Sequence, residues 1–233
     1  MRQRRDKGDT DPFVRVRVFI NHLDFARSWQ FEQAKLIGKQ LGAVEKANAI
    51  AESMSIKWES LPEIILEQLE EMAYIGETPK EIRAVDIYAS VDKRNDAAKH
   101  EFELWLDEDL DPLPGFQVHT FSTKKENKKI CKQCDRPLDR SELVKGLNTK
   151  VACDLLSHAV NDSYDIAVLI MDDPEIVPSV LGVQEIFDKQ IIHVGSRGEG
   201  DALRSAAWGN FYLDRLVSQL MTSDDFKRKY KKK

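Results

Sequence analysis

The chain has 233 residues, of which 42% are hydrophobic, and a formal net charge of −5. This length suits one large α/β domain, or one domain with an appendage, and the apolar content supports a real core. No run is apolar enough to suggest a membrane span, and the first seven residues lack the apolar core of a signal peptide. The three cysteines are too few for a disulfide framework, so we expect a cytoplasmic location.

The charges are segregated along the chain. Basic residues concentrate in an N-terminal arm over residues 1–12, in residues 123–140 and in a C-terminal tail over residues 222–233. Acidic residues concentrate in residues 59–81 and 101–111. Basic patches beside an acidic centre suit a protein that holds a polyanion and cuts it with a metal, although the terminal runs could equally be solvated tails.

The first half of the chain predicts strands and helices in alternation. Alternating β-branched residues indicate an opening strand, and Pro62 marks the first turn of a later helix. The expected elements are a strand over Val14–Ile20, a helix over Phe25–Leu41, a helical stretch over 43–57, a helix from Leu61, a strand over Ile82–Ala89 and a helix over Asp96–Leu106.

The second half continues the same alternation around a basic segment without regular periodicity, residues 123–140. The expected elements are a strand over Phe116–Phe121, a helix over Leu147–Val160, a strand over Ile166–Met171, a helix over Ile176–Phe187, a strand over Ile191–Val194 and two helices over Asp201–Ala207 and Tyr212–Met221. We therefore expect one α/β domain over residues 13–221, with a mostly parallel sheet, helices on both faces and a helical elaboration over about 25–80.

The apolar run Ile166–Met171 stops abruptly at three acids, Asp172, Asp173 and Glu175. Open parallel sheets carry their sites at the carboxyl ends of their strands. Clustered carboxylates repel one another unless a hard cation lies among them, so a Mg²⁺ or Mn²⁺ site is the first hypothesis. The alternative is an ordinary turn in which Asp172, Asp173 and Pro174 cap the next helix.

Further polar residues lie where they could join these acids. Asn21 and Asp24 follow the first strand, and Asn148 and Asp154 lie on the helix that begins at Leu147. In a parallel sheet such groups can converge although they are far apart in sequence. Asn148 and Asp24 also have a structural interpretation, because both are good residues for capping a helix.

Three motifs resemble those of NYN domains, the LabA-like branch of the PIN-like nuclease superfamily. They are Phe19-Ile-Asn-His-Leu-Asp-Phe25, Lys145-Gly-Leu-Asn-Thr-Lys-Val-Ala-Cys-Asp-Leu-Leu156 and the run from Tyr164 to Pro178. Val194-Gly195 and Trp208 also lie where the family has similar residues, so the resemblance spans about residues 14–215 in order. Each motif alone is weak, and their order and spacing together are specific.

The resemblance implies a PIN-like, Rossmannoid fold and hydrolysis of RNA phosphodiester bonds with Mg²⁺ or Mn²⁺. The family's catalytic positions fall on Asp173, Glu175, Asn21, Asn148, Asp24 and Asp154. Of these, Asp173, Glu175 and Asn21 are the expected metal ligands.

Two expected carboxylates are amides here, at positions 21 and 148. An amide offers an oxygen to a hard cation but no charge, so we expect weaker Mg²⁺ binding and less activation of water. Asp24 could compensate for Asn21, and Glu175 in place of Asp shifts the reach of a ligand. A natural pseudo-enzyme, an altered active site and an engineered inactive variant all stay open.

Basic residues near the motifs are candidates for binding RNA phosphates. They are Arg27, Lys145, Arg197, Lys124, Lys125, Lys128 and Lys129. Cys131 and Cys134 form half of a zinc site, which His119 or a second copy of the chain in a homodimer could complete, and a simple turn is the alternative. The four tryptophans fit helical packing positions.

The favoured function is a metal-dependent ribonuclease. A second hypothesis is a catalytically silent RNA-binding or regulatory protein that keeps the nuclease fold and predicts RNA affinity without turnover. A third is an interaction module, in which the acidic residues 59–81 and the Cys131–Cys134 segment mediate assembly.

Overall fold

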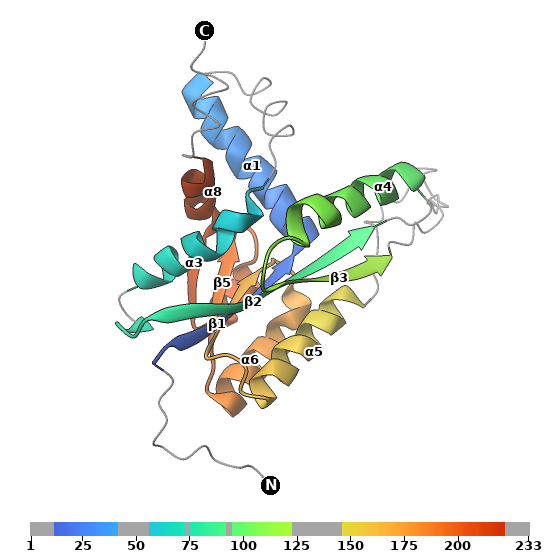
Figure 1. The fold of residues 1–233 in the computed structure, drawn as a ribbon. Coiled ribbons are helices and arrows are strands. Elements are labelled where there is room, and N and C mark those ends of the chain that lie inside the picture. The colour runs from blue at the N-terminus through green and yellow to red at the C-terminus, as the bar shows by residue number, and fades with distance from the viewer. Residues whose placement is uncertain (1–11, 42–55, 73–74, 92–94, 123–145, 222–233) are drawn as a thin grey trace, which may run out of the picture.

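The computed structural model of the protein describes residues 12–41, 56–72, 75–91, 95–122 and 146–221. Its centre is a six-stranded sheet in the order β3-β2-β1-β4-β5-β6, and every neighbouring pair of strands is parallel (Figure 1). The strands are β1 Val14–Asn21, β2 Lys80–Val91, β3 Phe116–Ser122, β4 Ile166–Ile170, β5 Gln190–Gly195 and β6 Gly209–Tyr212. The expected α/β fold with a parallel central sheet is confirmed.

The helices lie between the strands in the chain order that the sequence predicts. They are α1 His22–Leu41, α3 Leu61–Glu70, α4 Asp96–Trp105, α5 Leu147–Val160, α6 Val177–Phe187, α7 Asp201–Ala206 and α8 Leu213–Met221. Shorter helical turns are η1 Trp58–Ser60, the π-helical η3 Leu106–Leu110 and η4 Pro174–Ile176. The described part of the expected helical elaboration consists of α1, η1 and α3.

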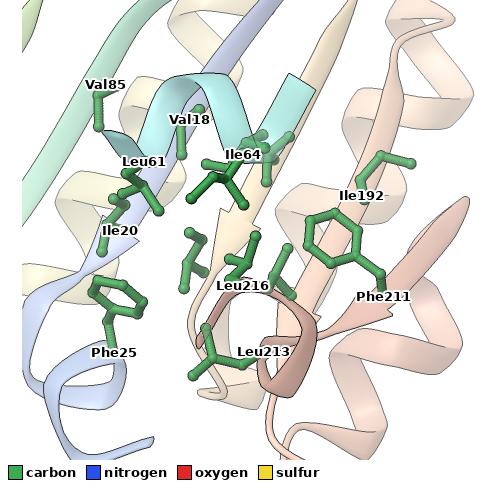
Figure 2. Close-up of a cluster of buried hydrophobic side chains, with 14 of the residues drawn as sticks. Val18, Ile20, Phe25, Leu61, Ile64, Val85, Ile192, Phe211, Leu213 and Leu216 are labelled. Atoms are coloured by element: carbon green, nitrogen blue, oxygen red, sulfur yellow. The ribbon is translucent and has the colours of Figure 1, made fainter. Parts of the chain in front are cut away.

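The two faces of the sheet are covered by different helices. Alternate residues of β1 point to opposite faces, so Val16, Val18 and Ile20 enter one core cluster while Phe19 enters the other. The first cluster packs beneath α1, α3 and α8, and Figure 2 shows Leu216 among its members. The second lies beneath α5 and α6. Both faces are buried, which explains the apolar strands.

Two predicted boundaries were wrong. A helix was expected to include Tyr212, which instead ends β6, a strand of four residues paired with β5. Such a short strand carries too little periodicity to be recognised, and its pairing with β5 decides its structure. The first helix begins at His22, and not at Phe25, because the side-chain oxygen of Asn21 accepts hydrogen bonds from the backbone of the first turn.

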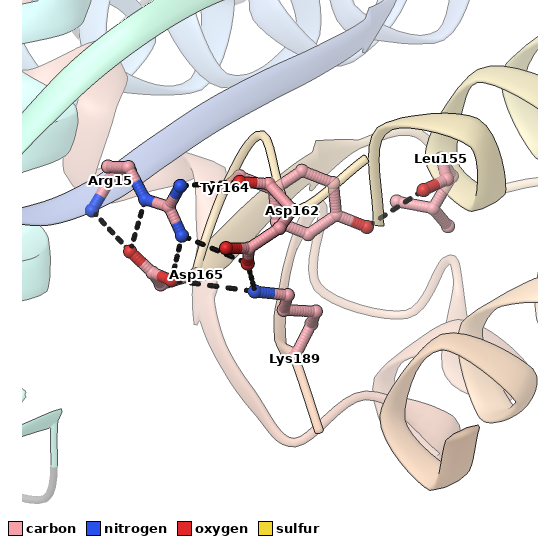
Figure 3. Close-up of polar contacts among 6 residues, drawn as sticks. All are labelled: Arg15, Leu155, Asp162, Tyr164, Asp165 and Lys189. Atoms are coloured by element: carbon pink, nitrogen blue, oxygen red, sulfur yellow. Dashed lines mark hydrogen bonds and ion pairs between the residues drawn. The ribbon is translucent and has the colours of Figure 1, made fainter. Parts of the chain in front are cut away.

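An ion-pair network ties the amino ends of β1 and β4 together (Figure 3). Arg15 donates from its backbone N and its Nε to Asp165 Oδ2, both at 2.9 Å. Lys189 Nζ lies 2.6 Å from Asp162 Oδ1, which also accepts from Arg15. This network stabilises the edge of the sheet opposite to the acids that follow β4.

Within the described ranges, no helix has the length and apolar character needed to cross a membrane.

Candidate active site

The carboxyl ends of β1 and β4 lie side by side. Ile20 pairs with Ile170 in parallel register, so the residue after each strand emerges at the same edge of the sheet. Asn21 and the acids that follow Met171 therefore belong to one edge, as the resemblance implies.

Asn148 joins the acids after β4. Its Nδ2 donates to Asp173 Oδ2 at 2.6 Å and to Glu175 Oε2 at 3.0 Å. Gly146, with φ of 90°, precedes α5 and places Asn148 in the first turn of the helix. Asn148 was a candidate helix cap, but in the structure its side chain donates to the two carboxylates instead.

Asp173 also serves the local turn. Its Oδ1 accepts from the backbone N of Glu175 at 2.9 Å, which caps η4. The structural and the functional interpretations of this acid are therefore compatible, because one carboxylate oxygen forms the turn while the other faces Asn148.

Asp24 brings a further carboxylate to this edge. Its Oδ2 accepts from the backbone N of Asp172 at 3.3 Å. Burial raises the pKa of Asp24, and the negative charges of Asp172 and Asp173 add to the rise, although the hydrogen bond from Asp172 opposes it. Asn21, in contrast, uses its Oδ1 to cap α1, with the N of Leu23 at 3.1 Å. Asn21 therefore positions Asp24, and its oxygen is already engaged.

The carboxylate of Asp172 lies in a space that two glycines leave open. A Cβ atom on Gly195 would lie 2.5 Å from Asp172 Oδ1, and one on Gly200 would collide with the same atom. Among the described residues this Oδ1 is buried without a hydrogen-bond partner. His193 Nε2 donates to the carbonyl of Met171 at 2.8 Å and lies 3.6 Å from Asp172 Oδ1.

A cavity of about 310 Å³ opens beside these acids. Its lining includes Asp24, Asp172, the exposed ring of Phe31 and both predicted phosphate-binding arginines, Arg27 and Arg197. The structure thus brings together groups from α1, from the end of β4 and from the loop after β5.

Arg197 is held by two contacts at the rim of this cavity. Its Nε donates to Asp214 Oδ2 at 3.0 Å, and its guanidinium lies 4.0 Å from the centre of the Tyr212 ring. The side chain is nevertheless 55% exposed, so the remaining donors can face a phosphate.

Asp154 belongs to another polar group. It accepts from the Tyr88 hydroxyl at 2.8 Å and from Lys150 Nζ at 2.5 Å. It neighbours the buried Arg17–Asp86 ion pair through His119, which lies 3.2 Å from Asp86 and 4.0 Å from Asp154. These contacts give Asp154 and His119 partners other than the acids after β4.

The remaining predicted residues lie outside the described ranges. They are Lys145, Lys124, Lys125, Lys128, Lys129, Cys131 and Cys134.

A divalent cation fits the donor set at Asp173, Glu175 and Asn148. No three His, Cys, Asp or Glu side chains form a metal-ligand group within the part of the chain that the structure describes. Two carboxylate oxygens nevertheless converge on one atom, Asn148 Nδ2. The third group is an amide, which can offer its oxygen to Mg²⁺ or Mn²⁺.

No family model matches the chain, and no curated protein matches it. A solved structure of a protein of unknown function from Vibrio parahaemolyticus is similar, with 14% sequence identity and a TM-score of 0.48. The similarity covers 88% of this chain and 96% of that one.

Proposed function

We propose that the protein is a divalent-cation-dependent ribonuclease of the NYN/PIN-like type that hydrolyses RNA phosphodiester bonds. The observation that carries the proposal is the convergence of Asp173, Glu175 and Asn148 at the carboxyl edge of the sheet. Like charges held this close favour a cation. The arginine-lined cavity lies beside Asp24 and Asp172, and its two arginines suit a phosphate. The proposal includes a cytoplasmic location.

In this proposal Asp173 and Glu175 would hold Mg²⁺ or Mn²⁺, and the amide oxygen of Asn148 would be a further ligand. The bound cation would polarise the scissile phosphate and lower the pKa of water. Asp24 is suited to accept the proton of the attacking water, because burial and neighbouring charges raise the pKa of its carboxyl group.

RNA would lie across the cavity. Arg27 and Arg197 would contact backbone phosphates, and Phe31, which is 62% exposed, would offer its ring to a base. An exposed aromatic ring beside two arginines is a common arrangement for single-stranded nucleic acid.

The test is cleavage of a labelled RNA pool in Mg²⁺, Mn²⁺ or EDTA. This chain is compared with Asp173→Ala, with Asn21→Asp/Asn148→Asp and with Glu185→Ala, an exposed acid on α6. Cleavage that EDTA and Asp173→Ala abolish, and that Glu185→Ala leaves intact, supports the proposal. Absence of cleavage by both this chain and the restored variant would overturn it.

A second candidate is a catalytically silent RNA-binding or regulatory protein with the same fold. The amide nitrogen of Asn148 favours it, because this donor supplies the positive end of a dipole where a nuclease would hold a cation. It predicts RNA binding that EDTA does not change, with cleavage only in the restored variant.

A further inference from the structure

Helix α1 separates two cavities. Asp24, Arg27 and Phe31 line the cavity beside the acids, whereas His22 and Trp29 line a second one of about 400 Å³ between α1, η1 and α4. The second cavity uses other residues and is independent of the proposed nuclease site.

Five aromatic side chains, including that of His22, line this second cavity. Trp58 is 2% exposed and lies at its base, and the centre of its ring is 5.8 Å from that of Trp105. The Trp105 ring lies 4.5 Å from His22 and 5.3 Å from Phe102. Burial lowers the pKa of His22 to about 4, so its ring is neutral at neutral pH.

The charged groups that line the cavity are negative. Glu101 and Asp109 contribute carboxylates, and no lysine or arginine of the described residues lines it. Desolvation raises the pKa of Asp109, and the negative charges of Glu108 and Glu59 add to the rise. A cation entering the cavity would therefore relieve repulsion among these acids.

We propose that this second cavity binds an organic ammonium ion, in the form of a methylated ammonium group. The aromatic rings of the lining attract the cation, and Glu101 and Asp109 complement its charge. The same two acids repel phosphate, which sets this cavity apart from the arginine-lined one. Its volume lies within the range typical of small-molecule sites.

The test is a titration of the full chain with choline, read by tryptophan fluorescence. Three of the four tryptophans line the cavity, so occupancy should change the emission. The matched control ligand is the neutral isostere in which carbon replaces the choline nitrogen. We expect saturable binding of choline and at least about tenfold weaker binding of the isostere, because only the cation gains from the rings and acids.

Substitutions of the two acids test whether choline binds in this cavity. Asp109→Asn and Glu101→Gln change exposed side chains, so the fold should persist, and each should weaken choline binding by roughly threefold or more. Glu185→Gln, on α6, should leave it unchanged. Equal affinity for the isostere, no saturable response to choline, or unchanged affinity in both acid variants would overturn the proposal. Tighter binding of guanosine than of choline would also overturn it, in favour of a base-binding pocket.

Discussion

Asn148 Nδ2 lies 2.6 Å from Asp173 Oδ2, so an amide nitrogen of α5 meets the acids after β4. The same nitrogen reaches Glu175, 27 residues further along the chain, at 3.0 Å. The uncharged amide donates to both carboxylates and so offsets part of their repulsion. An aspartate at position 148 would add a third negative charge, so we expect that variant to depend on a cation.

Asn148→Asp should make stability depend on a divalent cation. In EDTA the variant loses two hydrogen bonds to carboxylates and gains a like charge, which should cost about 1–2 kcal/mol. In a chain of this length, such a loss corresponds to a fall of roughly 2–8 °C in Tm. Mn²⁺ should bring the Tm of Asn148→Asp back up, and should not raise the Tm of Asn148→Ala. A melting temperature that ignores Mn²⁺ in both variants would contradict the expectation.

Arg17 should be essential for folding stability. Its Nε lies 2.6 Å from Asp86 Oδ2, and these side chains are 10% and 1% exposed. Arg17→Met leaves a buried carboxylate whose side-chain partner among the described residues is His119, and should cost about 3–5 kcal/mol of unfolding free energy. Urea unfolding measures this cost. The double variant Arg17→Met/Asp86→Leu should cost less than the sum of its single changes, and simple additivity would argue against the pair.

Asp165 should contribute a pH-dependent part of the stability. Burial opposes its ionisation, but the hydrogen bonds from Arg15 outweigh this and lower the pKa to about 2, below its ordinary 3.8. A lowered pKa stabilises the folded state above about pH 4, and this contribution is lost as the pH falls toward 2. Asp165→Asn should therefore flatten the dependence of Tm on pH in that window.

The effect at Asp165 should be modest, because its side chain is 37% exposed and solvent screens the pair. Asp201→Asn, which changes an exposed acid on α7, serves as the control. Parallel curves for Asp165→Asn and the unchanged chain would show that Arg15 contributes nothing through this acid.

Gly195→Ala and Gly182→Ala should have opposite effects. A Cβ on Gly195 would lie 2.5 Å from Asp172 Oδ1 and 2.7 Å from His193, so the substitution should cost about 1–3 kcal/mol. Gly182 lies within α6 with nothing within 4 Å of the added Cβ, so alanine should stabilise by about 0.5–1 kcal/mol. Chemical denaturation of both variants measures the difference. Equal effects would mean that the space around Asp172 can relax.

The alternation of strands and helices was readable from local patterns. Strands buried on both faces are runs of β-branched and other apolar residues, as in Val14–Ile20, and their order implied parallel pairing. The strand β6 was missed because four residues carry almost no periodicity. The position of such a strand depends on the neighbouring strand, which local patterns do not describe.

The candidate site was only partly predictable. Spacing and strand ends indicated Asp173, Glu175 and Asn148, which the structure brings together. Asp154 lies on the same helix as Asn148 but bonds Tyr88. The sequence did not indicate the aromatic cavity, because its tryptophans fit ordinary helical packing positions.

The sequence by itself determined the fold class and the edge of the sheet where the acids gather. Runs of apolar residues mark the buried strands, and the polar residues that follow them mark the strand ends. Only the tertiary structure decided which partner each polar side chain takes. Asn148 bonds acids that follow it by more than twenty residues, and His22 packs between rings from η1 and α4. Such contacts depend on how the helices pack on the sheet. If a helix shifted by one residue, its side chains would meet different partners.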